Sequence, residues 1–155
     1  MIKVLFVCLG NICRSPLAEG IFKDLLEKNN LSDQISCDSA GTLNYHVGSV
    51  PDHRSRKVAL NHGFELRHKG RQLQIADFED FDYILGMDNS NMSNIKLLEK
   101  NCKNPKAKLF LMRDFDVESS PKEVADPYSK TEKEFEECYQ ILKRCSKNLL
   151  EFLKK

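Results

Sequence analysis

The sequence predicts an α/β fold in three layers, αβα, with a four-stranded parallel sheet between helices. Four short apolar runs alternate with segments whose apolar residues recur at helical spacing, an order that is typical of βαβ units. The first run, residues 2–7 (IKVLFV), is apolar without alternation, as expected for a strand buried on both faces. The length of 155 residues suits a single domain over residues 1–155.

The first half of the chain is expected to contain two strand–helix pairs. The first strand, residues 2–7, is followed by apolar residues at helical spacing that continue to the asparagine pair at 29–30. The second strand is expected at residues 34–40, because QISCDSA is bounded by polar segments. A loop then leads into a helix near residues 53–62, which stops at Gly63.

The second half repeats this order and adds one irregular segment. A third strand at residues 81–87 (FDYILGM) precedes a helix at about residues 89–100, and a fourth strand is expected at residues 106–112 (KAKLFLM). The last helix is the clearest, because one apolar stripe runs from Phe135 to Leu153. Between them, residues 113–130 are expected to be irregular, and a loop of that length is usually functional or mobile.

Charge and composition argue against several classes of protein. A formal net charge of +1 disfavours a nucleic-acid-binding or membrane-surface protein, and no apolar run approaches the roughly 18 residues that span a bilayer. The N-terminal residues resemble a strand rather than a signal peptide, so a cytoplasmic location is expected. Reduced thiols are then expected, and no metal or cofactor, because the cysteine spacing does not suit zinc. The cysteines are Cys8, Cys13, Cys37, Cys102, Cys138 and Cys145.

The stretch VCLGNICRSP, residues 7–16, comes directly after the first strand. It separates Cys8 from Arg14 by five residues. This spacing alone is weak evidence, because Cys138 and Arg144 share it inside the last helix, where Cys138 is expected to be a core residue. Position distinguishes the first pair, since ligands of parallel α/β folds bind beyond the carboxyl ends of the strands.

The residue types in this stretch suit the binding of an oxyanion. Gly10 and Asn11 tolerate unusual backbone angles, so backbone N–H groups can point inward at the start of the next helix, where the dipole adds positive potential. The guanidinium of Arg14 can bind two phosphate oxygens, and these groups together favour Cys8 as a thiolate. Such a site predicts phosphoryl transfer to sulfur. The alternative, a buried cysteine beside a helix-capping Ser15, stays open on these residues alone.

The sequence VCLGNICRSPLAE resembles the signature of the low-molecular-weight protein tyrosine phosphatases. Four further motifs follow in the family's order and spacing, so the resemblance covers essentially the whole chain. It implies a four-stranded parallel sheet flanked by helices, and a metal-independent protein tyrosine phosphatase with a phosphocysteine intermediate and acid phosphatase activity. The four motifs are DSAG (38–41), HKGRQL (68–73), FDYILGMDNSN (81–91) and ADPYS (125–129).

Carried over residue by residue, the resemblance implies that Cys8 is the nucleophile, Arg14 binds the phosphoryl oxygens, and Asp126 is the general acid. The chemistry needs an acid because the leaving phenolate must take up a proton, and the long loop can carry Asp126 over the cleft. Ser15 resembles the hydroxyl that hydrogen-bonds the thiolate. The other residues implied to bind phosphate or support the loop are Leu9, Gly10, Asn11, Ile12, Cys13, Ser39 and His68.

The resemblance also implies a substrate cleft with aromatic walls. Tyr45 and Tyr128 occupy the wall positions, so the expected partners are phosphotyrosine-containing proteins, with inorganic phosphate or other oxyanions in the loop. No nucleic acid or membrane partner is expected. In relatives the second loop cysteine can pair with the nucleophile, which implies that Cys13 makes Cys8 redox-sensitive. Many vertebrate members carry two tyrosines after Asp-Pro, whereas Ser129 follows Tyr128 here.

Three other functions are compared with this one. A thioredoxin-coupled arsenate reductase shares the fold and loop but needs two further cysteines, in and after the region that here reads ILGMDNSN. That region contains no cysteine, and Cys102 alone cannot supply the relay. Protein-arginine phosphatases of this type carry Thr at the position of Ile12, so Ile12 favours an aryl phosphate. A non-enzymatic phosphate-binding or redox-sensing module would need Cys8 and Arg14 but not Asp126.

Overall fold

The computed structural model describes residues 1–118 and 121–155 and contains a parallel β-sheet. All three strand pairings are parallel, and Val7 lies opposite both Ala40 and Gly86. The predicted four-stranded parallel sheet is therefore confirmed. The strands are β1 (Ile2–Cys8), β2 (Ile35–Gly41), β3 (Tyr83–Gly86) and β4 (Lys108–Leu111), in the order β2-β1-β3-β4.

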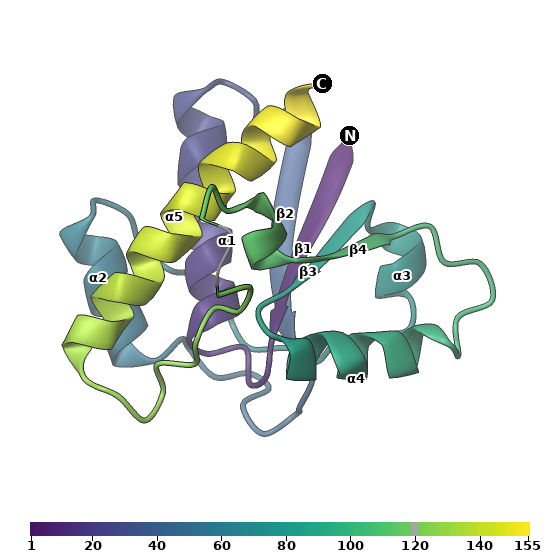
Figure 1. The fold of residues 1–155 in the computed structure, drawn as a ribbon, viewed down its shortest axis with the longest axis horizontal. Helices are drawn as coiled ribbons and strands as arrows, with labels where there is room; N and C mark the ends of the chain where they lie inside the picture. Colours follow the sequence, from purple (N-terminus) through teal and green to yellow (C-terminus); the bar gives the residue numbers. More distant parts are fainter. Residues whose placement is uncertain (119–120) are drawn as a thin grey trace.

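Helices cover both faces of the sheet, which confirms the predicted three layers (Figure 1). Three helices lie together on one face, and two lie on the other. Among the described residues, we find no helix with both the length and the apolar character needed to cross a membrane. The first group comprises α1 (Arg14–Lys28), α2 (His53–Asn61) and α5 (Glu132–Lys154), and the second comprises α3 (Asp77–Asp80) and α4 (Asn89–Glu99).

Strand β1 is buried on both faces, as its uniform apolar pattern predicts. Phe6 points into the first core layer and meets Phe22 of α1 edge to face, with ring centroids 5.8 Å apart. Its neighbour Leu5 points the opposite way and belongs to the second layer, with Phe78 of α3 and Ile95 of α4. Consecutive residues of one strand thus anchor helices on opposite sides of the sheet.

The structure also contains two short elements that the sequence pattern did not predict. Helix α3 lies between α2 and β3, and the 3₁₀ helix η1 (Met112–Phe115) occupies the start of the segment that was expected to be irregular from residue 113. Each spans four residues, about one helical turn, so neither can show recurring apolar spacing.

The second cysteine–arginine pair is structural, as predicted from its place in a helix. Cys138 is 4% exposed within the core, whereas Arg144 donates to both carboxylate oxygens of Asp116 at 2.8 and 3.0 Å. The hydrogen bonds from Arg144 hold the pKa of Asp116 down at about 2. This ion pair therefore fastens the segment after η1 to α5.

The topology brings three chain segments together at one edge of the sheet. The chain passes from β1 to β2 on one side and then to β3 on the other, so the loop after β1 lies where the direction of the connections changes. Because all strands are parallel, the segments that follow Cys8, Gly41 and Gly86 meet at this edge. A ligand site is expected there.

Candidate active site

The segment between β1 and α1 forms a tight turn centred on Asn11; we call residues 8–14 the Cys8 loop. Asn11 has a φ of 58°, in the left-handed region that asparagine tolerates better than most residues. Gly10, which also tolerates unusual backbone angles, does not share this positive φ. A Cβ at Gly10 would lie 3.1 Å from Cδ2 of His46, so a larger residue there would require that side chain to shift.

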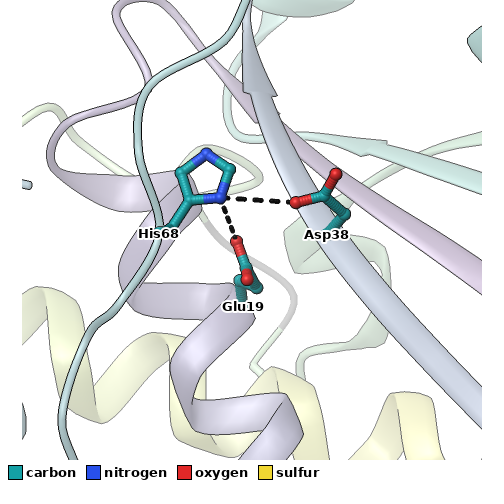
Figure 2. A group of neighbouring side chains, drawn as sticks. All are labelled: Glu19, Asp38 and His68. Carbon is teal, nitrogen blue, oxygen red and sulfur yellow. Dashed lines mark ion pairs between the residues drawn. The ribbon is translucent and has the colours of Figure 1, made fainter. Parts of the chain in front are cut away.

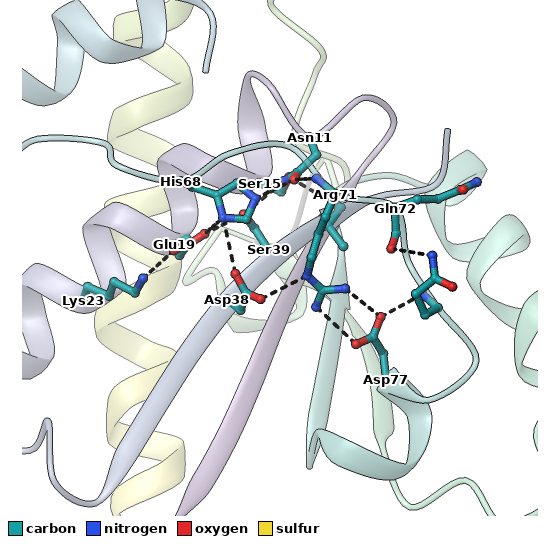
Figure 3. Close-up of polar contacts among 12 residues, drawn as sticks. Asn11, Ser15, Glu19, Lys23, Asp38, Ser39, His68, Arg71, Gln72 and Asp77 are labelled. Carbon is teal, nitrogen blue, oxygen red and sulfur yellow. Dashed lines mark hydrogen bonds and ion pairs between the residues drawn. The ribbon is translucent and has the colours of Figure 1, made fainter. Parts of the chain in front are cut away.

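The side chain of Asn11 supports the loop from inside. It is 1% exposed, and its Nδ2 donates to Oγ of Ser15 (2.8 Å) and Oγ of Ser39 (3.0 Å). Its Oδ1 lies 2.6 Å from Nε2 of His68 and accepts a hydrogen bond from the backbone N–H of Arg71 (2.9 Å). Four side-chain contacts thus join the loop to α1, β2 and the segment after α2 (Figure 3).

Ser15 lies in the first turn of α1, and its hydroxyl faces the sulfur of Cys8 at 3.0 Å. Because Oγ already accepts a hydrogen bond from Asn11, its proton is directed away from Asn11. The sulfur is nearer than the other acceptor, the carbonyl of Ala40 at 3.4 Å. The hydroxyl of Ser15 is therefore placed to donate to the sulfur of Cys8. Ser15 is not the helix cap, since that position belongs to Cys13.

Arg14 is 2% exposed and is oriented by one of its terminal nitrogens. Nη1 donates to Oδ2 of Asp88 (2.7 Å) and to the carbonyl of Val124 (2.9 Å). Burial alone would lower its pKa, but the neighbouring Cys8 and Asp88 raise it above the ordinary value, so the guanidinium is charged. Nη2 lies 3.6 Å from Oδ2 of Asp126, and the buried Nε has no hydrogen-bond partner among the described residues. The Nε–Nη2 edge can therefore bind an oxyanion in a bidentate manner.

His68 lies between two carboxylates behind the loop (Figure 2). Its Nδ1 is 3.1 Å from Oε1 of Glu19 and 3.3 Å from Oδ1 of Asp38. The two carboxylates beside Nδ1 act as hydrogen-bond acceptors, so Nδ1 is protonated. Oδ1 of Asn11 can only accept, so Nε2 is also protonated, and the ring is an imidazolium. Burial opposes this charge, but hydrogen bonds to Asp38 and Glu19 outweigh it and raise the pKa of His68 to about 9.

His68 and its two carboxylate partners form an ion-pair network rather than a metal site. Ligand atoms of Glu19, Asp38 and His68 lie within 4.8 Å of one another, which is close enough for a metal ion. A doubly protonated imidazole offers no lone pair to a metal, however. A protonated His68 therefore pairs with Glu19 and Asp38 as a charge.

Arg71 extends this network toward α3 (Figure 3). Its Nε donates to Oδ2 of Asp38 (3.1 Å), and its two terminal nitrogens donate to both oxygens of Asp77 (3.0 and 3.1 Å). At the other end, Lys23 pairs with Glu19 at 2.5 Å. Cations and anions thus alternate across the back of the Cys8 loop, so each buried charge has an opposite partner.

A cavity of about 140 Å³ opens on the other side of the loop. Two segments far away in the sequence complete its walls: residues 43–46 after β2, and the Asp126–Tyr128 region before α5. Tyr45 is 81% exposed and Tyr128 is 52% exposed, so both line the outer part of the cavity. The full lining is Cys8, Leu9, Gly10, Ile12, Cys13, Arg14, Leu43, Tyr45, His46, Asp126 and Tyr128.

Cys13 lines this cavity together with Cys8 and is 4% exposed. Burial raises the pKa of its thiol, and the nearby Asp52 carboxylate raises it further. Cys13 is therefore a neutral thiol at neutral pH. The cavity holds two cysteines whose surroundings differ, because only Cys8 has a hydroxyl donor at its sulfur in the described part of the chain.

Every residue predicted from the sequence to belong to the site lies either in this cavity or in the network around Asn11. Sequence reasoning missed several residues that contact them or line the same cavity. Asp88 follows β3 at the same edge of the sheet as Cys8, so its position was a usable signal, whereas a single valine or charged residue elsewhere carries none by itself. The missed residues are Glu19, Asp38, Leu43, His46, Arg71, Asp77, Asp88 and Val124.

The raised pKa of His68 predicts a stability contribution that depends on pH. A pKa of about 9, against about 6.5 in the unfolded chain, means that the imidazolium stabilises the fold fully below pH 6.5. We expect His68→Gln to lower the free energy of unfolding by about 3 kcal/mol there, and the gap to wild type to narrow as the pH rises through about 9. Urea unfolding from pH 6 to 9.5 measures this gap.

The matched control is His53→Gln, because the side chain of His53 is 75% exposed at the start of α2. This variant should follow the wild-type stability curve at every pH. A gap between wild type and His68→Gln that does not change with pH would show that the ring is held as neutral imidazole.

Comparison with known proteins assigns the chain to a family. The family model for "Low molecular weight phosphotyrosine protein phosphatase" matches residues 3–155. The rat protein of that name is 44% identical over 149 residues, covering 96% of this chain and 94% of the relative. The Saccharomyces cerevisiae protein of the same name is 41% identical over 157 residues, covering 99% and 94%.

Solved structures show the same similarity in three dimensions. A protein tyrosine phosphatase from Entamoeba histolytica matches with a TM-score of 0.91 at 40% identity, over 99% of this chain and 97% of that one. A Drosophila arginine phosphatase matches with a TM-score of 0.95 at 35% identity, over 99% of both chains. From its sequence, its fold and the geometry of its Cys8 loop, this chain belongs to the low molecular weight phosphotyrosine protein phosphatase family.

Proposed function

We propose that this protein hydrolyses phosphotyrosine and other aryl phosphates through a phosphocysteine intermediate. The observation that carries the proposal is the buried Nε of Arg14, which has no partner among the described residues and belongs to a cavity shared with Cys8 and Asp126. An oxyanion on the Nε–Nη2 edge satisfies this atom. Inorganic phosphate and other oxyanions occupy the same edge as competing ligands.

In the first step the thiolate of Cys8 attacks phosphorus in line with the leaving oxygen. The S–P bond forms as the P–O bond breaks, and the negative charge lies on the three equatorial oxygens. Backbone N–H groups of the Cys8 loop, the N-terminus of α1 and Arg14 stabilise this charge. Asp126 donates its proton to the leaving phenolate, which would otherwise depart as a strong base.

In the second step the same carboxylate acts as a base. Asp126, now ionised, takes a proton from water, which attacks phosphorus and releases inorganic phosphate and the Cys8 thiolate. The Ser15 hydroxyl stabilises that thiolate as it departs, because its Oγ lies 3.0 Å from the sulfur. One hydroxyl thus favours sulfur as a nucleophile in the first step and as a leaving group in the second.

The cavity lining supports an aryl phosphate as substrate. Tyr45 and Tyr128 offer aromatic surfaces near its mouth, against which a phosphotyrosine ring can stack. Ile12 adds an apolar wall. Phosphotyrosine-containing proteins are therefore the proposed partners, and a side-by-side assay with a phosphoarginine substrate separates the two classes.

An arsenate reductase and a phosphate-binding module both fit the chain less well than a phosphatase. The arsenate reductase relay requires cysteines in and after residues 84–91, and that segment contains none. A module that only binds phosphate does not require a carboxylic acid opposite Arg14, yet Asp126 lies in the cavity wall 3.6 Å from the guanidinium. We further propose one domain over residues 1–155 and a cytoplasmic location, which suits the six free cysteines.

The nucleophile is tested by Cys8→Ser. We expect hydrolysis of p-nitrophenyl phosphate to fall by about 10⁴-fold or more, because a hydroxyl is a far weaker nucleophile than a thiolate at neutral pH. The urea unfolding midpoint and the binding of inorganic phosphate, measured by calorimetry, should remain close to wild type because Arg14 is unchanged. Turnover near the wild-type rate would rule out Cys8 as the nucleophile.

The general acid is tested by Asp126→Ala with two substrates of different leaving-group strength. We expect kcat/KM to fall by about 100-fold for phenyl phosphate and much less for p-nitrophenyl phosphate, whose phenolate departs without a proton. The exposed Asp33→Ala serves as the charge-matched control and should behave as wild type. An equal loss with both substrates would contradict the acid role.

The redox role of Cys13 is tested with peroxide. Peroxide oxidises the Cys8 thiolate to a sulfenic acid, and attack by the Cys13 thiol forms a disulfide and releases water. We expect wild type to regain activity with dithiothreitol, whereas Cys13→Ser regains a smaller fraction because its sulfenic acid oxidises further. Cys102→Ser, at a half-buried cysteine that does not line the cavity, should recover as wild type does. Equal recovery by Cys13→Ser would remove the protective role.

A further inference from the structure

Asp126 lies in a short segment that the protein anchors on its N-terminal side. Val124 is fully buried, its backbone N–H donates to the carbonyl of Met87 (2.8 Å), and its carbonyl accepts from Arg14 (2.9 Å). The backbone two residues before Asp126 is therefore fixed. A second anchor after Asp126 is needed to define where the carboxyl group lies.

Arg54 of α2 supplies contacts on the C-terminal side. Its Nη2 donates to the carbonyl of Tyr128 (2.8 Å), and its Nη1 donates to the carbonyl of Lys130 (2.7 Å). These acceptors lie two and four residues after Asp126 in the chain. The N–H of Tyr128 donates in turn to Oδ1 of Asp126 (3.1 Å), so the backbone of this one residue links Arg54 to the carboxylate.

Asp52 fixes the guanidinium of Arg54 and connects it to the Cys8 loop. Nε and Nη2 of Arg54 each lie 3.0 Å from an oxygen of Asp52, which also accepts the backbone N–H of Arg54 (2.9 Å) as the cap of α2. The backbone N–H of Asp52 donates to the carbonyl of Ile12 (2.7 Å). Through Arg54 and Asp52, hydrogen bonds therefore connect the segment after Asp126 to the loop that carries Cys8.

The surroundings of Arg54 make these contacts stronger than those of a surface arginine. Its side chain is 20% exposed, and its guanidinium lies over the ring of Phe135, 4.4 Å from the centroid. An arginine that stacks on an aromatic ring and forms several hydrogen bonds at fixed angles holds its partners more rigidly than an exposed ion pair does.

We propose that Arg54 is a positioning residue for Asp126: it holds the segment after the carboxylate against the Cys8 loop, so that the proton is aimed at the leaving oxygen. The inference rests on the proposed acid role of Asp126. Arg54 does not line the cavity, so it acts through the backbone carbonyls of Tyr128 and Lys130.

The test measures kcat/KM for phenyl phosphate and p-nitrophenyl phosphate with Arg54→Ala, Arg54→Lys and Asp126→Ala. This parameter covers steps up to the first irreversible one, in which the leaving group departs. We expect Arg54→Ala to lose about tenfold with phenyl phosphate and less than about twofold with p-nitrophenyl phosphate, since misplacement by about 1 Å costs up to 100-fold. Arg54→Lys keeps the charge but cannot reproduce the fork, so it should lie in between and carries the test if the alanine variant does not fold.

Arg56→Ala is the matched control, because Arg56 is an exposed arginine on the same helix whose Nε donates to the carbonyl of Pro51 (3.0 Å). It removes the same charge without touching the segment after Asp126 and should behave as wild type. In the Asp126→Ala background, Arg54→Ala should cause no further loss with phenyl phosphate, since the group that it positions is gone.

The outcomes separate the two proposals. If Asp126→Ala discriminates between the substrates but the Arg54 variants reduce both equally or not at all, the positioning role is overturned and the acid role stands. If Asp126→Ala itself does not discriminate, both are overturned. An additional loss caused by Arg54→Ala in the Asp126→Ala background would show a structural role and also overturn the positioning role.

Discussion

The carboxamide of Asn11 is the interaction on which the geometry of the site depends. It uses both amide hydrogens on Ser15 and Ser39, and its oxygen faces two donors, His68 and the backbone of Arg71. Exchanging the oxygen and nitrogen would direct N–H groups at N–H groups, so one orientation is allowed. That orientation keeps Asn11 in its left-handed conformation, and the neighbouring backbone must then curve around the space in front of Cys8.

The ion pairs behind the loop keep both nitrogens of His68 protonated until the pH approaches its pKa of about 9, so the ring donates to Asn11 at neutral pH. A neutral His68 could present an unprotonated nitrogen to Asn11, which would place two acceptors 2.6 Å apart. Glu19 and Asp38 prevent this by keeping the ring protonated, and Lys23 and Arg71 balance the carboxylates in turn. Charges outside the cavity thus support the shape of the Cys8 loop.

What the sequence predicted well depends on neighbours along the chain. The order of strands and helices, and the loop after β1, follow from local apolar patterns and from the position of Gly10 to Ser15, which local physics can interpret. The contacts of Arg71 with Asp77 and of Arg54 with Tyr128 could not be predicted in this way. They join charged side chains and a backbone carbonyl, and such groups are equally common on segments that face only solvent. Helix α3 was missed because a helix of four residues is too short for apolar residues to recur at helical spacing. Only the topology decides which of these groups meet.

Asp126 suits the proposed mechanism because the structure places it beside the guanidinium that would receive the phosphoryl group. Its Oδ2 lies 3.6 Å from Nη2 of Arg14, so an oxyanion on the Nε–Nη2 edge would lie next to the carboxyl group. One carboxyl group can then face the leaving oxygen in the first proposed step and the attacking water in the second. Both proposed steps depend on the backbone after Asp126, where the N–H of Tyr128 donates to Oδ1 of Asp126 and the carbonyls of Tyr128 and Lys130 accept from Arg54.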